Sequence, residues 1–194
     1  MHTDQLTRPD WDALYAIAEE QDGYFTTAQA ASVGFSSPLL NHHLGAQRLE
    51  RVRRGIYRLK NYPPGEHEDL VVFWLWSDSR GVFSHETVLA LQALGEVFPG
   101  RIHMTLPWEW RTRRLTVPKP LLLHYCDLPK EDRAWFGAVP VTTISRALLD
   151  CTEASIAPEL LSTAYKDAKI RGVVEPRHER IIRDYLDRFG GKNE

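Results

Sequence analysis

The chain has 194 residues, a length that suits one large domain or two small ones. Hydrophobic residues make up 43% of it, enough to bury a core, and the formal net charge is −2. This balance argues against a protein that coats nucleic acid indiscriminately, but it permits one localised basic surface.

Export and membrane insertion are not expected. No stretch approaches the roughly 20 apolar residues that span a bilayer, and the polar start lacks the apolar centre of a signal peptide. Cys126 and Cys151 lie far apart and outside any Cys-x-x-Cys motif. We therefore expect a cytoplasmic protein with reduced thiols and no membrane partner.

Residues 10–22 are predicted to form a first helix, because Trp11, Leu14 and Ala18 belong to an apolar stripe at helical spacing. A second helix should start at Thr26, which forms a capping-box pattern with Gln29. Gly34 should end this helix in a left-handed turn.

A third helix is expected from Ser37, as N-cap, to about Arg48. Helical spacing turns Leu40 and Leu44 towards the core and Asn41 towards the opposite side. An asparagine can read adenine through its amide, and a histidine can reach a base edge or a phosphate. The candidate base-reading residues are Ser37, Asn41, His42 and Gln47.

A basic hairpin follows the third helix, with Gly55 as the turn residue. Residues 36–60 contain six cations and only one carboxylate, Glu50. Helix, turn, helix and cationic ribbon together predict a winged helix-turn-helix that binds duplex DNA. The candidate phosphate-binding residues are Arg48, Arg51, Arg53, Arg54, Arg58 and Lys60. A solvated basic face and a protein-docking module remain alternatives.

Residues 61–65, Asn-Tyr-Pro-Pro-Gly, mark the clearest boundary. We expect a DNA-binding domain over residues 1–62 and a mixed α/β domain over 63–194, an α+β protein overall. The expected helices of the second domain are 66–79, 84–94, 142–150, 158–170 and 176–189, and its strands are 101–106, 121–126 and 138–141.

Five segments in order along the chain resemble the AbiEi family of bacterial antitoxins. They are Gly23–Ala30, Leu49–Arg58, Ser84–Leu91, Ile102–Pro107 and Pro140–Asp150. The resemblance implies an N-terminal winged helix-turn-helix and an antitoxin-like C-terminal α/β domain. It further implies a non-enzymatic repressor that binds operator repeats of its own toxin–antitoxin operon. The implied functional partner is a nucleotidyltransferase-like toxin, countered without a stable complex.

The third helix departs from the family pattern, because relatives often carry arginine where this chain has Asn41 and His42. Phosphate attraction should then come mainly from the wing. Binding could be modest, pH-dependent through His42 and His43, or dependent on pairing two copies on a repeat.

Two other features of the second domain can be read in more than one way. Arg111, Arg113 and Arg114 alternate with tryptophans, a mixture that can form a second basic surface for nucleic acid or a loop anchored on its own domain. His85 and Glu86 are adjacent without a further ligand at metal-binding spacing, which favours a structural pair. No catalytic residue, cofactor or metal ligand is predicted.

Two rival functions remain open. One is a protein-interaction module that neutralises a toxin by direct contact. The other is a small nuclease, which would need clustered acidic residues beside a lysine, and Glu159 with Lys166 does not supply that set.

Overall fold

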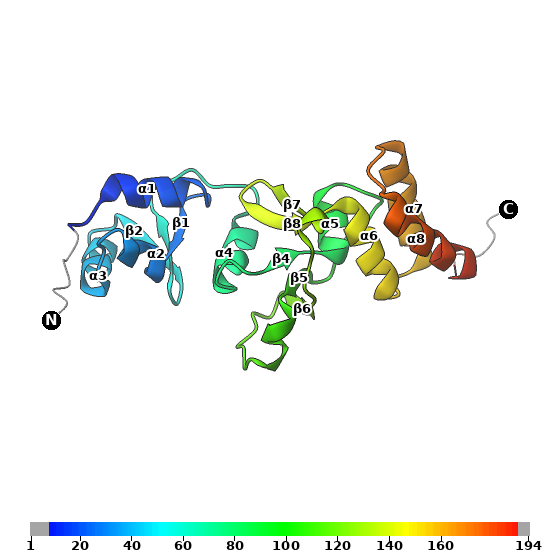
Figure 1. The fold of residues 1–194 in the computed structure, drawn as a ribbon. Coiled ribbons are helices and arrows are strands. Elements are labelled where there is room, and N and C mark those ends of the chain that lie inside the picture. Colours follow the sequence, from blue (N-terminus) through cyan, green and yellow to red (C-terminus); the bar gives the residue numbers. More distant parts are fainter. Residues whose placement is uncertain (1–7, 190–194) are drawn as a thin grey trace. The chain divides into compact units, whose positions relative to one another are not determined.

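The computed structural model describes residues 8–189, and the chain divides into two compact units, Met1–Ser79 and Arg80–Glu194 (Figure 1). Within the described residues, every helix is too short or too polar to cross a membrane.

The first unit combines four helices with a small antiparallel sheet of strand order β1-β3-β2. The elements are α1 (Trp11–Glu19), β1 (Tyr24–Thr26), α2 (Thr27–Ser32), α3 (Ser37–Gly45), β2 (Leu49–Arg53), β3 (Ile56–Leu59) and α4 (Glu68–Trp76). The strand β1 was not predicted, because three residues are too few to show alternation.

The capping box predicted for α2 is confirmed. The Thr26 hydroxyl accepts from the Gln29 amide at 3.2 Å, and the Gln29 side chain accepts from the Thr26 amide at 2.8 Å. Gly34 has the expected left-handed backbone, with φ of +88°.

The ends of α3 differ from the prediction at both termini. Ser36, rather than Ser37, is the N-cap, because its hydroxyl accepts from the Leu39 amide at 3.4 Å. The helix ends at Gly45 instead of Arg48, and Gln47 takes a left-handed φ of +55°, which no helix can continue through.

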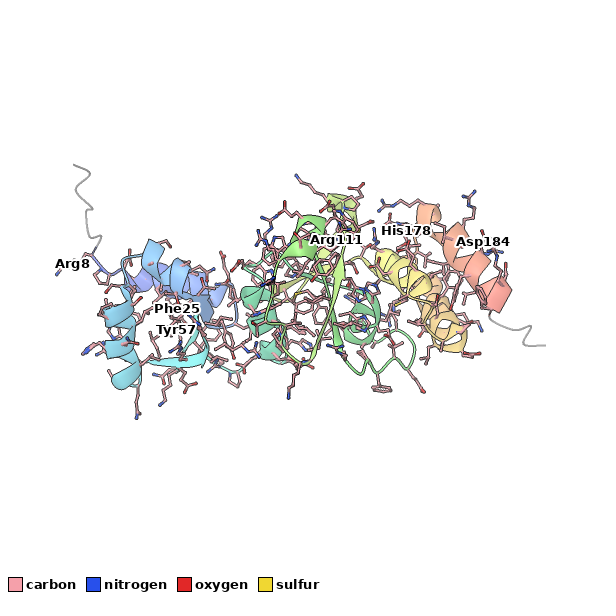
Figure 2. The ribbon with its side chains drawn as sticks, turned by 90° about the horizontal axis from the view of Figure 1, so that it is seen from below. Arg8, Phe25, Tyr57, Arg111, His178 and Asp184 are labelled. Atoms are coloured by element: carbon pink, nitrogen blue, oxygen red, sulfur yellow. The ribbon has the colours of Figure 1, made fainter. Side chains whose placement is uncertain are left out.

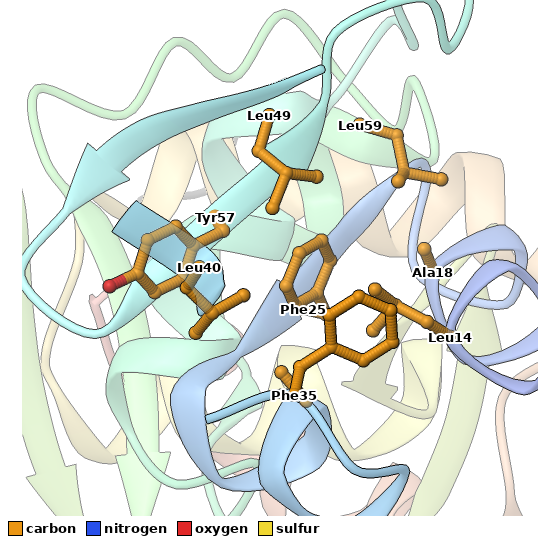
Figure 3. Packing of buried hydrophobic residues seen from close by; sticks show 9 residues of the cluster. Leu14, Ala18, Phe25, Phe35, Leu40, Leu49, Tyr57 and Leu59 are labelled. Carbon is orange, nitrogen blue, oxygen red and sulfur yellow. The ribbon is translucent and has the colours of Figure 1, made fainter. Parts of the chain in front are cut away.

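The core of the first unit lies between α1–α3 and the sheet (Figure 3). Phe25 from β1 and Phe35 from the turn before α3 are fully or almost fully buried, and Phe25 stacks on Tyr57 with ring centroids 5.8 Å apart. Figure 2 shows Phe25 and Tyr57 inside this unit. The remaining members are Leu14, Ala18, Ala30, Leu40, Leu49 and Leu59.

The central strand β3 is buried on both faces. Tyr57 and Leu59 belong to the core under α1–α3, whereas Ile56 and Arg58 alternate to the opposite face. Helix α4 contacts β1 and β3, so the first compact unit continues past the boundary expected at 62/63.

The hairpin β2–β3 contains a bulge. Arg51 pairs with Tyr57, but Arg53 pairs with Ile56, so Val52 is an extra residue on β2. Because opposed residues point to the same face, the bulge places Arg51 and Arg53 on opposite faces of the sheet. With α2, the turn and α3, this hairpin completes a winged helix-turn-helix, as predicted.

The second unit contains a five-stranded mixed sheet of order β6-β5-β4-β8-β7, in which β5–β6 and β4–β8 are the parallel pairs. Its strands are β4 (Val82–Phe83), β5 (Ile102–Leu106), β6 (Leu121–Tyr125), β7 (Arg133–Phe136) and β8 (Val139–Thr142). The short strands β4 and β7 were not predicted.

Helices of the second unit stack outward from the sheet. Helix α5 contacts β5 and β8, α6 packs on α5, and α7 and α8 pack on α6 (Figure 1). The bounds are α5 (His85–Leu91), α6 (Ile144–Glu153), α7 (Pro158–Ile170) and α8 (Pro176–Phe189), with short 3-10 helices η1 (Trp108–Thr112) and η2 (Lys130–Asp132). The fold is therefore α+β, as expected.

Gly23 and Gly45 form a matched pair for testing the first unit. Gly23 has φ of +87°, and a Cβ there would lie 2.6 Å from Cγ of Tyr62, whereas a Cβ on Gly45 would meet nothing within 4 Å. Gly23→Ala should lower the free energy of unfolding by roughly 2–4 kcal/mol. Gly45→Ala should leave it unchanged or raise it by up to about 1 kcal/mol.

Chemical denaturation measures this difference, and hydrogen exchange of peptides from residues 8–79 assigns it to the first unit. Equal stability of the two variants would contradict the packing of Tyr62 on Gly23.

Candidate nucleic-acid interface

The outer face of α3 is exposed and almost uncharged. Asn41 and His42 lie on it, together with Ser37 at the first turn, while Leu40 is fully buried beneath. The small residues Gly45 and Ala46 are exposed at its end, so a nucleic-acid backbone could approach closely there. The structure thus brings three of the four predicted base-reading residues onto one exposed face.

The position predicted for the fourth residue, Gln47, was wrong. It was expected on α3, but it lies in the turn after the helix, where its Oε1 accepts from Nζ of Lys60 at 3.3 Å. The Lys60 amide donates to the carbonyl of Arg48 at 3.1 Å. Arg48, Gln47 and Lys60 therefore form a polar group at the base of the hairpin, next to the C-terminal end of α3.

Arg51 and Arg54 are exposed along β2 and its turn. The neighbouring Arg53 is half-buried, and its guanidinium lies 5.4 Å from the ring centroid of Phe73 in α4. A guanidinium that packs on an aromatic ring of its own domain is less free to bind a ligand. Arg51 and Arg54 are therefore the hairpin arginines best placed to meet phosphates.

Arg58 requires the main correction among the predicted phosphate-binding residues. Its Nη2 lies 2.9 Å from a carboxylate oxygen of Glu68, and its side chain is only 11% exposed. The same nitrogen donates to the carbonyl of Tyr62 at 2.8 Å, and the guanidinium lies over Tyr24. Arg58 links the sheet to α4 and is not available to DNA, because α4 covers that face of β3.

The two histidines of α3 have different surroundings. His42 is exposed, whereas His43 is buried edge-on against Trp11, with ring centroids 4.8 Å apart. Burial lowers the pKa of His43, and His42 and Arg48 add to the effect. His43 is therefore not placed to give α3 a pH-dependent contact with DNA.

The second basic stretch is built on tryptophans. Trp110 is buried and carries Arg113 on its ring at 4.0 Å, while the half-exposed Trp108 carries Arg111 at the same distance. Arg111, Arg113 and Arg114 are all exposed. The loop is thus anchored on its own unit by Trp110, and its three arginines remain exposed to solvent.

Three histidines of the second unit come together, which sequence reasoning missed. The rings of His85 and His124 stack with centroids 3.7 Å apart, and His103 Nδ1 lies 3.1 Å from His124 Nε2. Burial lowers the pKa of His85 to about 3 and that of His124 to about 4, with neighbouring histidines adding to both shifts. Burial also lowers the pKa of His103, so burial favours the neutral form of all three rings.

A second group, Asp132, Glu175 and His178, is held by arginines. Arg177 lies 2.6 Å from oxygens of both Asp132 and Glu175, and Arg146 bonds the other Asp132 oxygen at 3.1 Å. These pairs hold the start of α8 against α6 and η2. The group is a structural network, because arginine nitrogens occupy its carboxylate oxygens.

Residues 12–60 match the family model described as "Transcriptional regulator, AbiEi antitoxin". Over these residues the chain is similar to AbiEi antitoxin regulators. The match extends from α1 to β3 and therefore includes α3, the hairpin and every predicted DNA-binding residue of the first unit. It confirms the predicted resemblance over these residues. Comparison with curated proteins gives no match.

The placement of Arg58 predicts a division of roles on the AbiEi hairpin. Arg58→Met should lower the free energy of unfolding by about 1–2 kcal/mol, because Glu68 loses its charged partner. Arg54→Met should change it by less than about 0.5 kcal/mol, because Arg54 is exposed. Chemical denaturation of the two variants provides the measurement. An unchanged stability of Arg58→Met, with weaker DNA binding, would return Arg58 to the phosphate-binding set.

Proposed function

We propose that this AbiEi regulator represses its own toxin–antitoxin operon by binding operator repeats as a cytoplasmic protein. The observation that supports this most directly is the exposed face of α3, with Asn41 and His42, beside a hairpin whose Arg51 and Arg54 are free of ion pairs in the part of the chain described. A helix with an adjacent cationic ribbon suits a major groove and its flanking phosphates.

Base reading and phosphate binding are assigned to different residues. Asn41 and His42, with Ser37 at the helix start, would select the sequence. Arg48, Arg51, Arg54 and Lys60 would neutralise phosphates, with Arg53 in a lesser part. Phosphate contacts fix the position of a protein on DNA and carry little sequence information, so the two sets are separable by experiment.

The second unit is proposed to counter a nucleotidyltransferase-like toxin, and catalysis has no part in the proposal. Neutralisation through direct contact is the competing outcome. Co-purification of this chain with the product of a neighbouring gene, together with no shift of upstream DNA, would favour direct contact over repression.

The wing is tested by its salt dependence. Arg51→Ala with Arg54→Ala should weaken binding to specific and random duplexes alike. It should also reduce the slope of log affinity against log salt by about 1.8, since each phosphate contact contributes about 0.9. Fluorescence anisotropy over a salt series gives the slope. The control, Arg180→Ala with Arg188→Ala, removes the same charge from exposed positions of α8 and should leave the slope unchanged. Equal slopes in all three proteins would remove the hairpin from the interface.

Base reading is tested with Asn41→Ala. Loss of a bidentate amide contact should weaken operator binding by about 1–3 kcal/mol and leave random-DNA binding unchanged. Asn61→Ala, an exposed asparagine outside α3 and the hairpin, serves as the control. Competition binding with operator and scrambled duplexes measures both. Parallel losses on both duplexes would show that Asn41 contacts the backbone or that α3 is not the reading helix.

A further inference from the structure

His85, His103 and His124 converge from three separate elements of the second unit. His85 opens α5, and the other two histidines lie on the parallel strands β5 and β6. Thr105 pairs with His124 across these strands, and His103 lies two residues before Thr105. Alternation therefore places both strand histidines on the same face of the sheet. The convergence results from strand register, so it has no signature in local spacing.

The backbone at His85 is unusual. Its φ of +54° lies in the left-handed region, which residues other than glycine rarely adopt. The surroundings fix this geometry, because the Ser84 amide donates to the carbonyl of His103 at 3.1 Å. Such conformations concentrate at functional sites, and this one brings the His85 ring onto that of His124.

Hydrogen bonds orient two of the rings from outside the cluster. Nδ1 of His85 lies 2.9 Å from the Ser84 hydroxyl, and Nε2 of His103 lies 3.3 Å from a carboxylate oxygen of Glu86. Nε2 of His85 is then the nitrogen left for a ligand, and Nδ1 of His103 lies 3.1 Å from His124 Nε2. A histidine that binds a metal commonly donates its second nitrogen to a carboxylate or another oxygen in this way.

We propose that His85, His103 and His124 bind one divalent transition-metal ion, with Zn²⁺ as the expected occupant. One ring nitrogen of each histidine lies within 4.8 Å of the others. A tetrahedral zinc site with bonds of 2.0–2.1 Å needs nitrogens about 3.3 Å apart. His103 and His124 have nitrogens 3.1 Å apart, but these share a hydrogen bond and the rings are nearly parallel, so zinc binding would replace that bond and rotate the rings towards the ion. Imidazole nitrogens select zinc and its neighbours over calcium or magnesium.

The fourth coordination position would face a pocket. A cavity of about 520 Å³ is lined by His85 and His124 and by the charged residues Arg111, Arg146, Asp150 and Glu153. Three protein ligands leave room for water or for one oxygen of an anion. Water is the expected fourth ligand, because Asp150 and Glu153 balance the two arginines of the lining and Arg146 is already paired with Asp150 at 2.6 Å. Glu86, which contacts His103, offsets part of the charge of the ion.

The cluster of Asp132, Glu175 and His178 supplies the contrast. Its donor atoms are equally close to one another, but Arg146 and Arg177 already bond its carboxylate oxygens. In the histidine cluster, no arginine is bonded to a ring nitrogen among the described residues. The proposal is independent of DNA binding, because every ligand belongs to the second unit.

The test uses the full chain without a polyhistidine tag, stripped with a chelator and titrated with Zn²⁺ by calorimetry. We expect about one ion per chain. Co²⁺ in place of Zn²⁺ should give the visible absorption of a four-coordinate site. His124→Asn should abolish both signals, since His124 is a ligand that is only partly buried. The control His42→Asn removes an exposed histidine of α3 and should change neither.

Histidine ¹⁵N shifts separate a metal site from a hydrogen-bonded cluster and do not depend on a variant that folds. Added Zn²⁺ should shift Nδ1 of His103 and Nε2 of His85 and His124, and no ring nitrogen of His42 or His178. Glu86→Gln should retain the stoichiometry and weaken binding about 10–100-fold. Unchanged shifts in the three rings, or full zinc binding by His124→Asn, would overturn the proposal.

Discussion

The ion pair between Arg58 and Glu68 decides which hairpin cations of the first unit remain free for a ligand. Arg58 Nη2 lies 2.9 Å from a carboxylate oxygen of Glu68 and so joins the central strand β3 to α4. One hairpin arginine is therefore used within the fold and does not face a ligand. Burial of β3 on both faces follows from the same packing, with α1–α3 on one side and α4 on the other. The cations left outside this pair are the ones that can face a ligand.

Local sequence signals predicted the first unit well, because its elements are set by short-range chemistry. The capping box at Thr26 and Gln29 and the left-handed Gly34 depend on residues at most four positions apart, and both are observed. The helix α3 was predicted to end at about Arg48 but ends at Gly45. The left-handed backbone that prevents its continuation occurs at Gln47, and no glycine marks that position in the sequence. The role of Arg58 could not be predicted either, because its partner Glu68 lies beyond the expected domain boundary.

Contacts across the sheet of the second unit could not be predicted from local sequence patterns. The longer helices and the strands β5, β6 and β8 were predicted near their observed positions, whereas the two-residue β4 was too short to show a pattern. Strand β7 was missed because it begins with Arg133 and exposes its large apolar residue Trp135. The convergence of His85, His103 and His124 could not be predicted, because parallel pairing of β5 with β6 joins positions about twenty residues apart. The candidate DNA-reading face needed only helical periodicity, and so it could be anticipated.

The bulge at Val52 has a consequence for how this surface can diverge. The extra residue alone places Arg51 and Arg53 on opposite faces of the sheet. The kind of side chain at each exposed position and the number of residues in β2 are therefore constrained separately. Exchange of one exposed residue for another alters only its own contact. Removal of a single residue would turn the side chain of Arg51 or Arg53 to the opposite face of the sheet, so this surface should tolerate replacement of exposed residues better than insertion or deletion at the bulge.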